Sequence, residues 1–193
     1  MNEPEPARIV VAITGASGAI YGVRALEMLS AMDHVETHVI ITPPARTTLA
    51  VETGRGTDEV EALADHVHPT RDIAASISSG SYRTNGMIVA PCSIKSLSAI
   101  ANSFNADLVA RAADVTLKER RPLVLMVRES PFHLGHLRLM TQVTEMGAIV
   151  HPPMPAFYNA PETIDDLVNH SVGHALEHLG LTVPDLARWS GVL

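Results

Sequence analysis

Stretches of uninterrupted apolar residues alternate along the chain with stretches of helical periodicity. Ile9 to Ile13 is apolar throughout and rich in β-branched residues, which is typical of a strand buried on both faces. A turn of small residues follows from Thr14 to Gly18, and apolar residues then recur with a helical period from Ile20 to Leu29. The pattern predicts a strand, a tight turn and a helix in succession.

The same alternation continues to the C-terminal part of the chain. It predicts further strands at 36–42, 87–90, 123–127 and 148–150, and helices at 45–53, 58–64, 95–102, 106–121, 134–146 and 162–179. The segment from His66 to Thr84 has no clear period, and its serine-rich part is expected to be a mobile loop over a site. Because the strands are apolar throughout and alternate with helices, we expect an α/β protein with three layers, α/β/α, and a mostly parallel, doubly wound sheet.

Polar and small residues follow several of the predicted strands. In parallel sheets, ligands bind beyond the carboxyl ends of the strands. This rule gathers residues 15–18, Thr42, residues 91–96 and Arg128 with Glu129 on one rim. We therefore expect the functional site at this rim.

The first turn has the composition of an anion site. Its backbone N–H groups and the positive end of the following helix favour a phosphate, and the hydroxyls of Thr14 and Ser17 can add donors. The spacing of Gly15 and Gly18 fits neither a P-loop nor the G-x-G-x-x-G fingerprint. The turn therefore indicates a nucleotide phosphate without indicating nicotinamide, and a close-packed turn without a ligand is the alternative.

Composition narrows the classes of function. A net charge of −7 and an aromatic content of 4% argue against nucleic-acid binding. The single cysteine, Cys92, fits a reducing cytoplasm, and no apolar run approaches the roughly 20 residues that a membrane span needs. The N-terminus lacks the pattern of a signal peptide. Because 46% of the residues are hydrophobic and only 18% are charged, we expect one domain over residues 1–193 with extra surface buried between subunits.

Cationic residues mark a second candidate region. The chain has two lysines, Lys95 and Lys118, and the latter lies at helical spacing from Arg111 and Asp114. A solvated helix end explains that spacing equally well. Arg128 directly follows a buried strand and is expected to be sheltered from water, and the adjacent Glu129 is either its ion-pair partner or an acid–base group.

Taken together, these segments resemble one known family. The resemblance rests on Thr14-Gly-Ala-Ser-Gly18, Pro91-Cys-Ser93 with Lys95, Ala112-Ala-Asp-Val-Thr-Leu-Lys-Glu-Arg-Arg-Pro-Leu-Val-Leu125, Arg128-Glu129, and Phe157-Tyr158 followed by Pro161. From Ile9 to about Gly180, the chain resembles the flavin prenyltransferases of the UbiX/Pad type. The long segment around Lys118 is the most specific of these motifs.

The resemblance implies a Rossmann-like fold and an enzyme that joins a dimethylallyl group to N5 and C6 of reduced FMN. The donor would be dimethylallyl phosphate or pyrophosphate, no metal would be needed, and prenylated FMN would pass to a decarboxylase of the UbiD type. The assembly would be a homododecamer with sites at subunit contacts. Residues 1–7 would be flexible, and the tail from 181 to 193 would pack on a neighbouring subunit.

Site residues are implied position by position. FMN would be bound by Gly15, Ala16, Ser17, Thr42, Ser93, Ile94, Lys95, Ser96 and Arg128. The prenyl phosphate would contact Arg111, Lys118, Tyr158 and His174. Catalysis would involve Ser17, Glu52 near N5 of the flavin, Lys118, and Glu129 as proton donor or acceptor. Fixed cations around a departing phosphate can stabilise its developing charge without a metal.

This chain departs from the family pattern at three positions. His174 replaces a usual arginine or lysine, Thr42 a common serine, and Val127 a common proline. A histidine with an ordinary pKa near ~6.5 is only partly charged at neutral pH, which predicts weaker and more pH-dependent phosphate binding.

Four alternatives concern other sites or functions. His170, His174 and His178 recur at four-residue spacing, but no further ligand accompanies them, and we expect no metal there. We expect Cys92 to be a small buried residue and not a nucleophile. The competing functions are an FMN storage or delivery protein and a flavin-dependent cysteine decarboxylase. The latter enzymes have a Pro-Ala-Ser-Ala-Asn-Thr-like segment where this chain has Pro91-Cys-Ser-Ile-Lys-Ser96.

Overall fold

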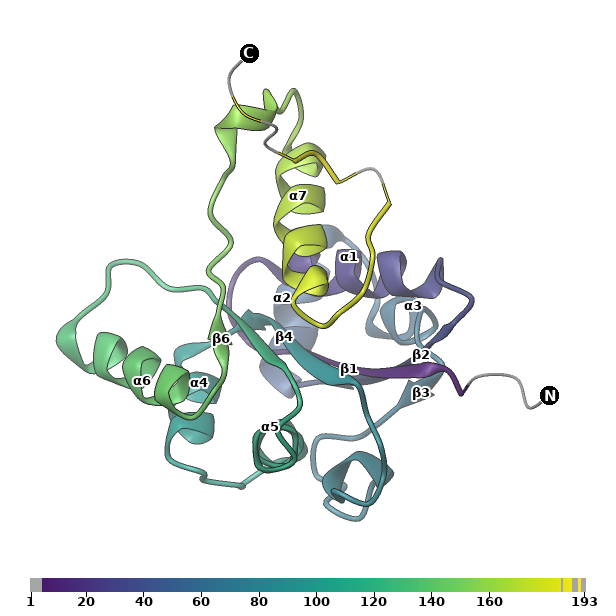
Figure 1. Cartoon of the computed structure of the whole chain (residues 1–193), viewed down its shortest axis with the longest axis vertical. Coiled ribbons are helices and arrows are strands. Elements are labelled where there is room, and N and C mark those ends of the chain that lie inside the picture. Colours follow the sequence, from purple (N-terminus) through teal and green to yellow (C-terminus); the bar gives the residue numbers. More distant parts are fainter. Residues whose placement is uncertain (1–4, 185, 189–190, 192–193) are drawn as a thin grey trace.

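The computed structural model describes residues 5–184, 186–188 and 191. Over these residues, six strands form one parallel sheet in the order β3-β2-β1-β4-β5-β6 (Figure 1). The strands are β1 (Ala7–Ile13), β2 (Val35–Ile41), β3 (His66–Val67), β4 (Gly86–Cys92), β5 (Leu123–Val127) and β6 (Ile149–Val150). The predicted α/β fold with a doubly wound parallel sheet is confirmed.

Helices cover both faces of this sheet. One face is packed by α1 (Ala19–Ser30), α2 (Pro43–Thr53), α3 (Thr57–Glu61) and α7 (Ile164–Glu177). The other face is packed by α4 (Ile94–Ala101), α5 (Leu108–Lys118) and α6 (Leu134–Glu145). Two short 3-10 helices, η1 (Ser76–Ser78) and η2 (Phe157–Asn159), lie in the connections.

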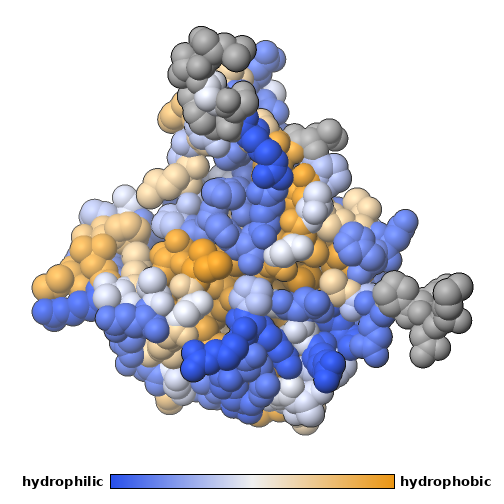
Figure 2. Space-filling view, viewed as in Figure 1, coloured by the Kyte–Doolittle hydropathy of each residue, from blue (hydrophilic) through white to orange (hydrophobic). Residues whose placement is uncertain are grey.

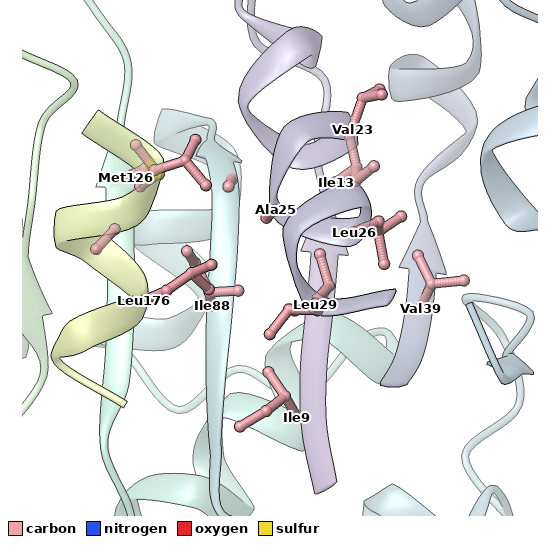
Figure 3. Packing of buried hydrophobic residues seen from close by; sticks show 14 of the residues in the cluster. Ile9, Ile13, Val23, Ala25, Leu26, Leu29, Val39, Ile88, Met126 and Leu176 are labelled. Carbon is pink, nitrogen blue, oxygen red and sulfur yellow. The ribbon is translucent and has the colours of Figure 1, made fainter. Parts of the chain in front are cut away.

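The position of β1 in the middle of the sheet explains why its sequence is apolar without interruption. Ile9 and Ile13 point to the α1 face, where they pack with Val23 and Leu26 (Figure 3). Val10 lies in the cluster on the opposite face. All of these side chains are at most 1% exposed. Burying a side chain of this size contributes about 1.5–3 kcal/mol, so both faces of the strand stabilise the fold.

The structure differs from the predicted elements mainly in the segment from His66 to Thr84. It contains β3 and η1, and Ile77 of η1 is buried. A strand of two residues is too short to show a period in the sequence, which is why β3 was missed. Pro91 does not end the third predicted strand. It lies inside β4, where the register of pairing to β5 shifts between Val89 and Cys92.

Within the single domain, residues 1–7 were predicted to be flexible and the tail from 181 to 193 to pack on a neighbouring subunit. Residues 1–4 lie outside the described residues, and β1 begins at Ala7, the last residue of the expected flexible segment. Near the other end, Leu181 and Val183 are buried in the cluster that contains α1 and α7. Packing of the tail, residues 181–193, on a neighbouring subunit stays a prediction, and residues 185, 189–190 and 192–193 of it lie outside the described ones.

Candidate functional site

The carboxyl ends of β1 and β4 are joined by hydrogen bonds. The hydroxyl of Thr14 donates to the carbonyl of Pro91 at 2.7 Å and accepts from the backbone N–H of Ser93 at 2.8 Å. The N–H of Arg128 donates to the carbonyl of Cys92 at 3.1 Å, which ties β5 to the same edge. From β1 the chain adds β2 and β3 on one side, and from β4 it adds β5 and β6 on the other. Such a switch point in the topology forms a crevice for a ligand.

A cleft of about 990 Å³ opens at this edge of the sheet. Its volume is at the upper end of the range of small-molecule sites. Seven of the residues predicted for the site line it: Gly15, Thr42, Ser93, Ile94, Lys95, Ser96 and Glu129. The rim predicted from the strand ends therefore exists within one chain.

Thr42 has an unusual environment in this cleft. It precedes α2 and is 8% exposed. Its hydroxyl oxygen is buried and has no hydrogen-bond partner. Buried polar atoms are nearly always paired, so this unpaired hydroxyl of a cleft residue is a candidate partner for a ligand's polar group.

Glu52 occupies the N-terminus of α1. Its carboxylate comes from α2 and accepts the backbone N–H groups of Gly18 at 2.8 Å and Ala19 at 2.9 Å. Burial alone would raise the pKa of Glu52, but the hydrogen bonds from Ser17, Ala19 and Gly18 and the charge of Arg128 together lower it. Glu52, Ser17 and Arg128 therefore form one group of interacting side chains, and none of the three lines the cleft itself.

This group corrects the prediction of an open anion site at the first turn. Two of the N–H groups expected to be free are bound to the carboxylate of Glu52, and the hydroxyl of Thr14 donates to a backbone carbonyl. The protein supplies its own anion at this helix N-terminus. Sequence inspection could not show this, because Glu52 is 34 residues from Gly18 along the chain.

The cleft also contains residues that sequence reasoning did not single out. They are Thr70, Arg71, Asn102, Phe104 and Asp107. Arg71 belongs to the segment for which no element was predicted. Asp107 caps α5 by accepting the N–H of Ala110 at 3.0 Å, and an aspartate directly before an apolar helical run could have indicated this position.

Arg111 and Lys118 lie on α5 and do not line the cleft. Arg111 donates to the carbonyl of Ser78 at 3.1 Å and pairs with Asp114 at 3.0 Å, while Lys118 pairs with Glu119. Asp107, the N-cap of α5, lines the cleft, and Lys118 is the last residue of the same helix. With a rise of 1.5 Å per residue, Lys118 lies about 16 Å from Asp107 along the helix axis. The serine-rich loop that was expected to cover a site packs against these cations.

Tyr158 and His174 lie on the other side of the sheet. Tyr158 is in η2, and its hydroxyl is 3.2 Å from Nε2 of His170. His174 is exposed on α7, with its ring centroid 5.1 Å from that of His151. Figure 1 shows η2 above α7 and far from α5. The four residues predicted to meet one phosphate are therefore not brought together in a single chain.

The remaining predictions concern individual side chains. Arg128 and Glu129 are both exposed, so the expected shelter of Arg128 from water is wrong for the single chain. Glu129 accepts the N–H of Ser130 at 2.9 Å. Cys92 is fully buried, and burial raises the pKa of its thiol to about 12, which confirms its interpretation as an inert core residue.

Comparisons with known proteins place this geometry in a family. The model of the flavoprotein family matches residues 2–175. The flavin prenyltransferase UbiX of Escherichia coli K12 is 56% identical over 186 residues, which cover 95% of this chain and 98% of the relative. The UbiX of Thauera aromatica is 56% identical over 184 residues, covering 95% of this chain and 94% of the relative.

Two solved structures have the same fold. A dodecameric FMN-dependent UbiX-like decarboxylase from Escherichia coli O157:H7 superposes with a TM-score of 0.93 at 49% identity, covering 95% of this chain and all of that one. AnUbiX, crystallised with FMN and dimethylallyl pyrophosphate, gives a TM-score of 0.94 at 48% identity over 98% of this chain and all of that one. The chain therefore belongs to the flavoprotein family and, within it, to the UbiX flavin prenyltransferases.

Proposed function

We propose that this chain is a flavin prenyltransferase that joins a dimethylallyl group from dimethylallyl phosphate or pyrophosphate to N5 and C6 of reduced FMN. Family membership supports the reaction, and AnUbiX binds FMN and dimethylallyl pyrophosphate. The observation from this chain that carries the proposal is the buried, unpartnered hydroxyl of Thr42 in a cleft at the switch point of the sheet.

Within the cleft, Gly15, Thr42 and residues 93–96 would bind FMN. Reduced flavin supplies an electron-rich acceptor, so no protein nucleophile is needed. Glu52 is held near the cleft by two backbone N–H groups and by Ser17, and this arrangement fixes a carboxylate beside the proposed flavin position. Glu129 lines the cleft and can exchange a proton with the leaving phosphate.

The cations for the phosphate would come from neighbouring copies of the chain. Arg111 and Lys118 lie on one face of the sheet, and Tyr158 and His174 on the other. One phosphate can contact all four only where several subunits meet. We therefore propose a homododecamer, as described for the UbiX-like protein of Escherichia coli O157:H7.

Exposed apolar residues support such an assembly. They include Leu134 and Leu137 on α6, and Met154 and Phe157 before and within η2. Figure 2 shows apolar surface over α6 and between α6 and α7. Apolar patches of this kind mark contacts between proteins.

The product and its destination follow from the same family. We propose that prenylated FMN passes to a decarboxylase of the UbiD type. A cytoplasmic location is proposed from the single cysteine, Cys92, which fits a reducing compartment. No described helix has both the length and the apolar character to cross a membrane.

FMN storage or delivery without chemistry is the second candidate. Two observations favour it: His174 stands where the family usually has a stronger cation, and the residues predicted to bind the phosphate do not line the cleft of one chain. Cysteine decarboxylation has less support. The FMN-dependent cysteine decarboxylase SpaF is 16% identical with a TM-score of 0.62, which is a likeness of fold alone.

Anaerobic incubation with reduced FMN and each of the two donors, followed by mass spectrometry of the extracted flavin, tests the proposal. We expect the flavin to gain one C5H8 unit with at least one donor. Tight binding of FMN that is recovered unmodified with both donors would instead identify a storage protein.

A further inference from the structure

Seven of the ten histidines lie in two clusters. One follows α7 and comprises His151, His170, His174 and His178. The other, which we call the β2–β3 cluster, comprises Glu36, His38, His66, His68 and Tyr82. Among the described residues, only Glu36, His38 and His66 bring three potential metal-ligand atoms within 4.8 Å of one another.

Backbone register brings these three side chains together. Glu36 and His38 are two residues apart on β2, so they project from the same face of the sheet. His66 on β3 is the direct cross-strand partner of His38. The convergence is therefore fixed by strand pairing.

Two of the distances between the ligand atoms match a metal coordination shell. Oε1 of Glu36 is 3.2 Å from Nε2 of His38 and 3.2 Å from Nε2 of His66. In a tetrahedral zinc site with bonds of about 2.0–2.1 Å, neighbouring ligand atoms lie about 3.3 Å apart. The two imidazoles are stacked with ring centroids 4.6 Å apart, and all three ligand atoms lie within 4.8 Å of one another, so a small rotation of His66, whose side chain is 51% exposed, would complete the shell.

Outer groups orient the ligands as they do in known metal sites. Nδ1 of His38 is 2.9 Å from Nε2 of His68, and Nε of Arg8 donates to Oε2 of Glu36 at 3.2 Å. Partners such as His68 and Arg8 hold a ligand's ring or carboxylate in place. The hydroxyl of Tyr82 is 3.1 Å from both Oε1 of Glu36 and Nε2 of His38, so it contacts the ligand atoms themselves and is the partner that a bound ion would replace.

The hydrogen-bond geometry of His38 leaves room for a cation. Nδ1 of His38 lies 2.9 Å from Nε2 of His68, so a proton on Nδ1 can be donated to His68. The lone pair of Nε2 then faces Oε1 of Glu36, 3.2 Å away, and a metal ion between these two acceptors satisfies both.

We propose that Glu36, His38 and His66 bind a divalent transition metal ion such as Zn²⁺, with water as the fourth ligand. The ion would tie the two-residue strand β3 to β2 at the edge of the sheet. Glu36 and His38 precede the carboxyl end of β2, whereas the cleft begins after it at Thr42. The site is structural and separate from prenyl transfer, which needs no metal.

Titration of the tag-free, chelator-treated full-length protein with Co²⁺ tests this proposal, because tetrahedral Co²⁺ has intense visible absorption. We expect one Co²⁺ per chain, displaced by Zn²⁺, and at least about tenfold weaker binding in His66→Val. His66→Gln is a second variant that keeps a polar side chain at this exposed position. His34→Val, an exposed histidine just before β2, is the matched control and should bind as the wild type does.

His178→Gln changes only the cluster along α7, so it shows which of the two clusters binds Co²⁺. Binding should be unchanged in this variant. The proposal is overturned if the wild type shows no tetrahedral spectrum, if His66→Val binds like His34→Val, or if binding is lost in His178→Gln and retained in His66→Val. An ordinary hydrogen-bond network, with Nε2 of His38 donating to Glu36, would give the first result.

Discussion

The two halves of the proposed active site are built differently. The flavin half lies at the carboxyl ends of β1 and β4, where hydrogen bonds through Thr14 join the two loops within one chain. The phosphate half is divided between α5 on one face of the sheet and η2 and α7 on the other. In this chain the strand ends assemble the cleft, but the residues predicted to meet the phosphate stay on opposite faces of the sheet. We propose that a second copy of the chain brings them together.

The largest expected effect tests the phosphate half. Lys118→Ala should lower kcat/KM for the prenyl donor by about 10²–10³-fold, because one fixed donor to the developing charge is lost. FMN affinity should stay within about twofold, since Lys118 does not line the cleft. Steady-state kinetics and FMN fluorescence titration measure the two quantities. Arg138→Ala, an exposed cation on α6, is the control; a matching loss of FMN affinity in Lys118→Ala would show that the halves are not separate.

A smaller effect tests the flavin half. Thr42→Val removes a hydroxyl that has no partner in the protein, so it should weaken FMN binding about 5–10-fold without lowering the free energy of unfolding. Thr14→Val is the matched buried threonine. Its hydroxyl makes two hydrogen bonds, so its loss should destabilise the fold by about 1–3 kcal/mol. FMN titration and urea unfolding separate the two variants; equal destabilisation by both would refute a ligand role for Thr42.

A further change is expected at His174. His174→Arg supplies a permanent, bidentate cation on α7 and should lower KM for the donor about 3–5-fold at pH 7.5. His178→Arg makes the same replacement one turn along the helix and should not lower KM. The comparison is measured by initial rates at varied donor concentration. Equal KM values in His174→Arg and the wild type would exclude contact between His174 and the phosphate.

A last change concerns how the stability of the region around α7 depends on pH. Burial and the nearby rings of His174 and His178 lower the pKa of His151 to about 4, and His170 adds to this effect. The unfolded chain therefore binds more protons than the folded chain between pH 6.5 and 4, and stability must fall as the pH is lowered through this window. His151→Gln should lose stability less steeply, by up to about 1.4 kcal/mol per pH unit. Urea unfolding at pH 7, 6 and 5 measures the slope; an unchanged slope would contradict the assignment.

Sequence patterns predicted the fold well because its strands are buried on both faces. Runs such as Ile9 to Ile13 and Leu123 to Val127 are short, uninterrupted apolar segments separated by helices, so each is recognised as a buried strand. β3 escaped prediction because two exposed residues carry no pattern. Its position is set by pairing with β2, which is a tertiary interaction.

The positions of site residues were predictable only where a residue directly follows a buried strand. Gly15, Thr42 and Ser93 follow buried strands, so the general rule for parallel sheets placed them correctly at one rim. The contact of Glu52 with Gly18 depends on how α2 packs against the first turn, and no local pattern encodes it. The separation of Lys118 from Tyr158 depends on which face of the sheet each connection covers.

Mixed assemblies test the division of the site most directly. Glu129→Gln impairs the cleft and Lys118→Ala impairs the phosphate half, so each variant alone should be nearly inactive. Co-expressed in equal amounts and purified as one assembly, the two chains should regain about a quarter of the wild-type prenyl transfer, because random assembly pairs an intact cleft with an intact Lys118 at that frequency. If mixed assemblies verified by mass spectrometry are no more active than either variant alone, the cleft and Lys118 act within one chain and the account is wrong.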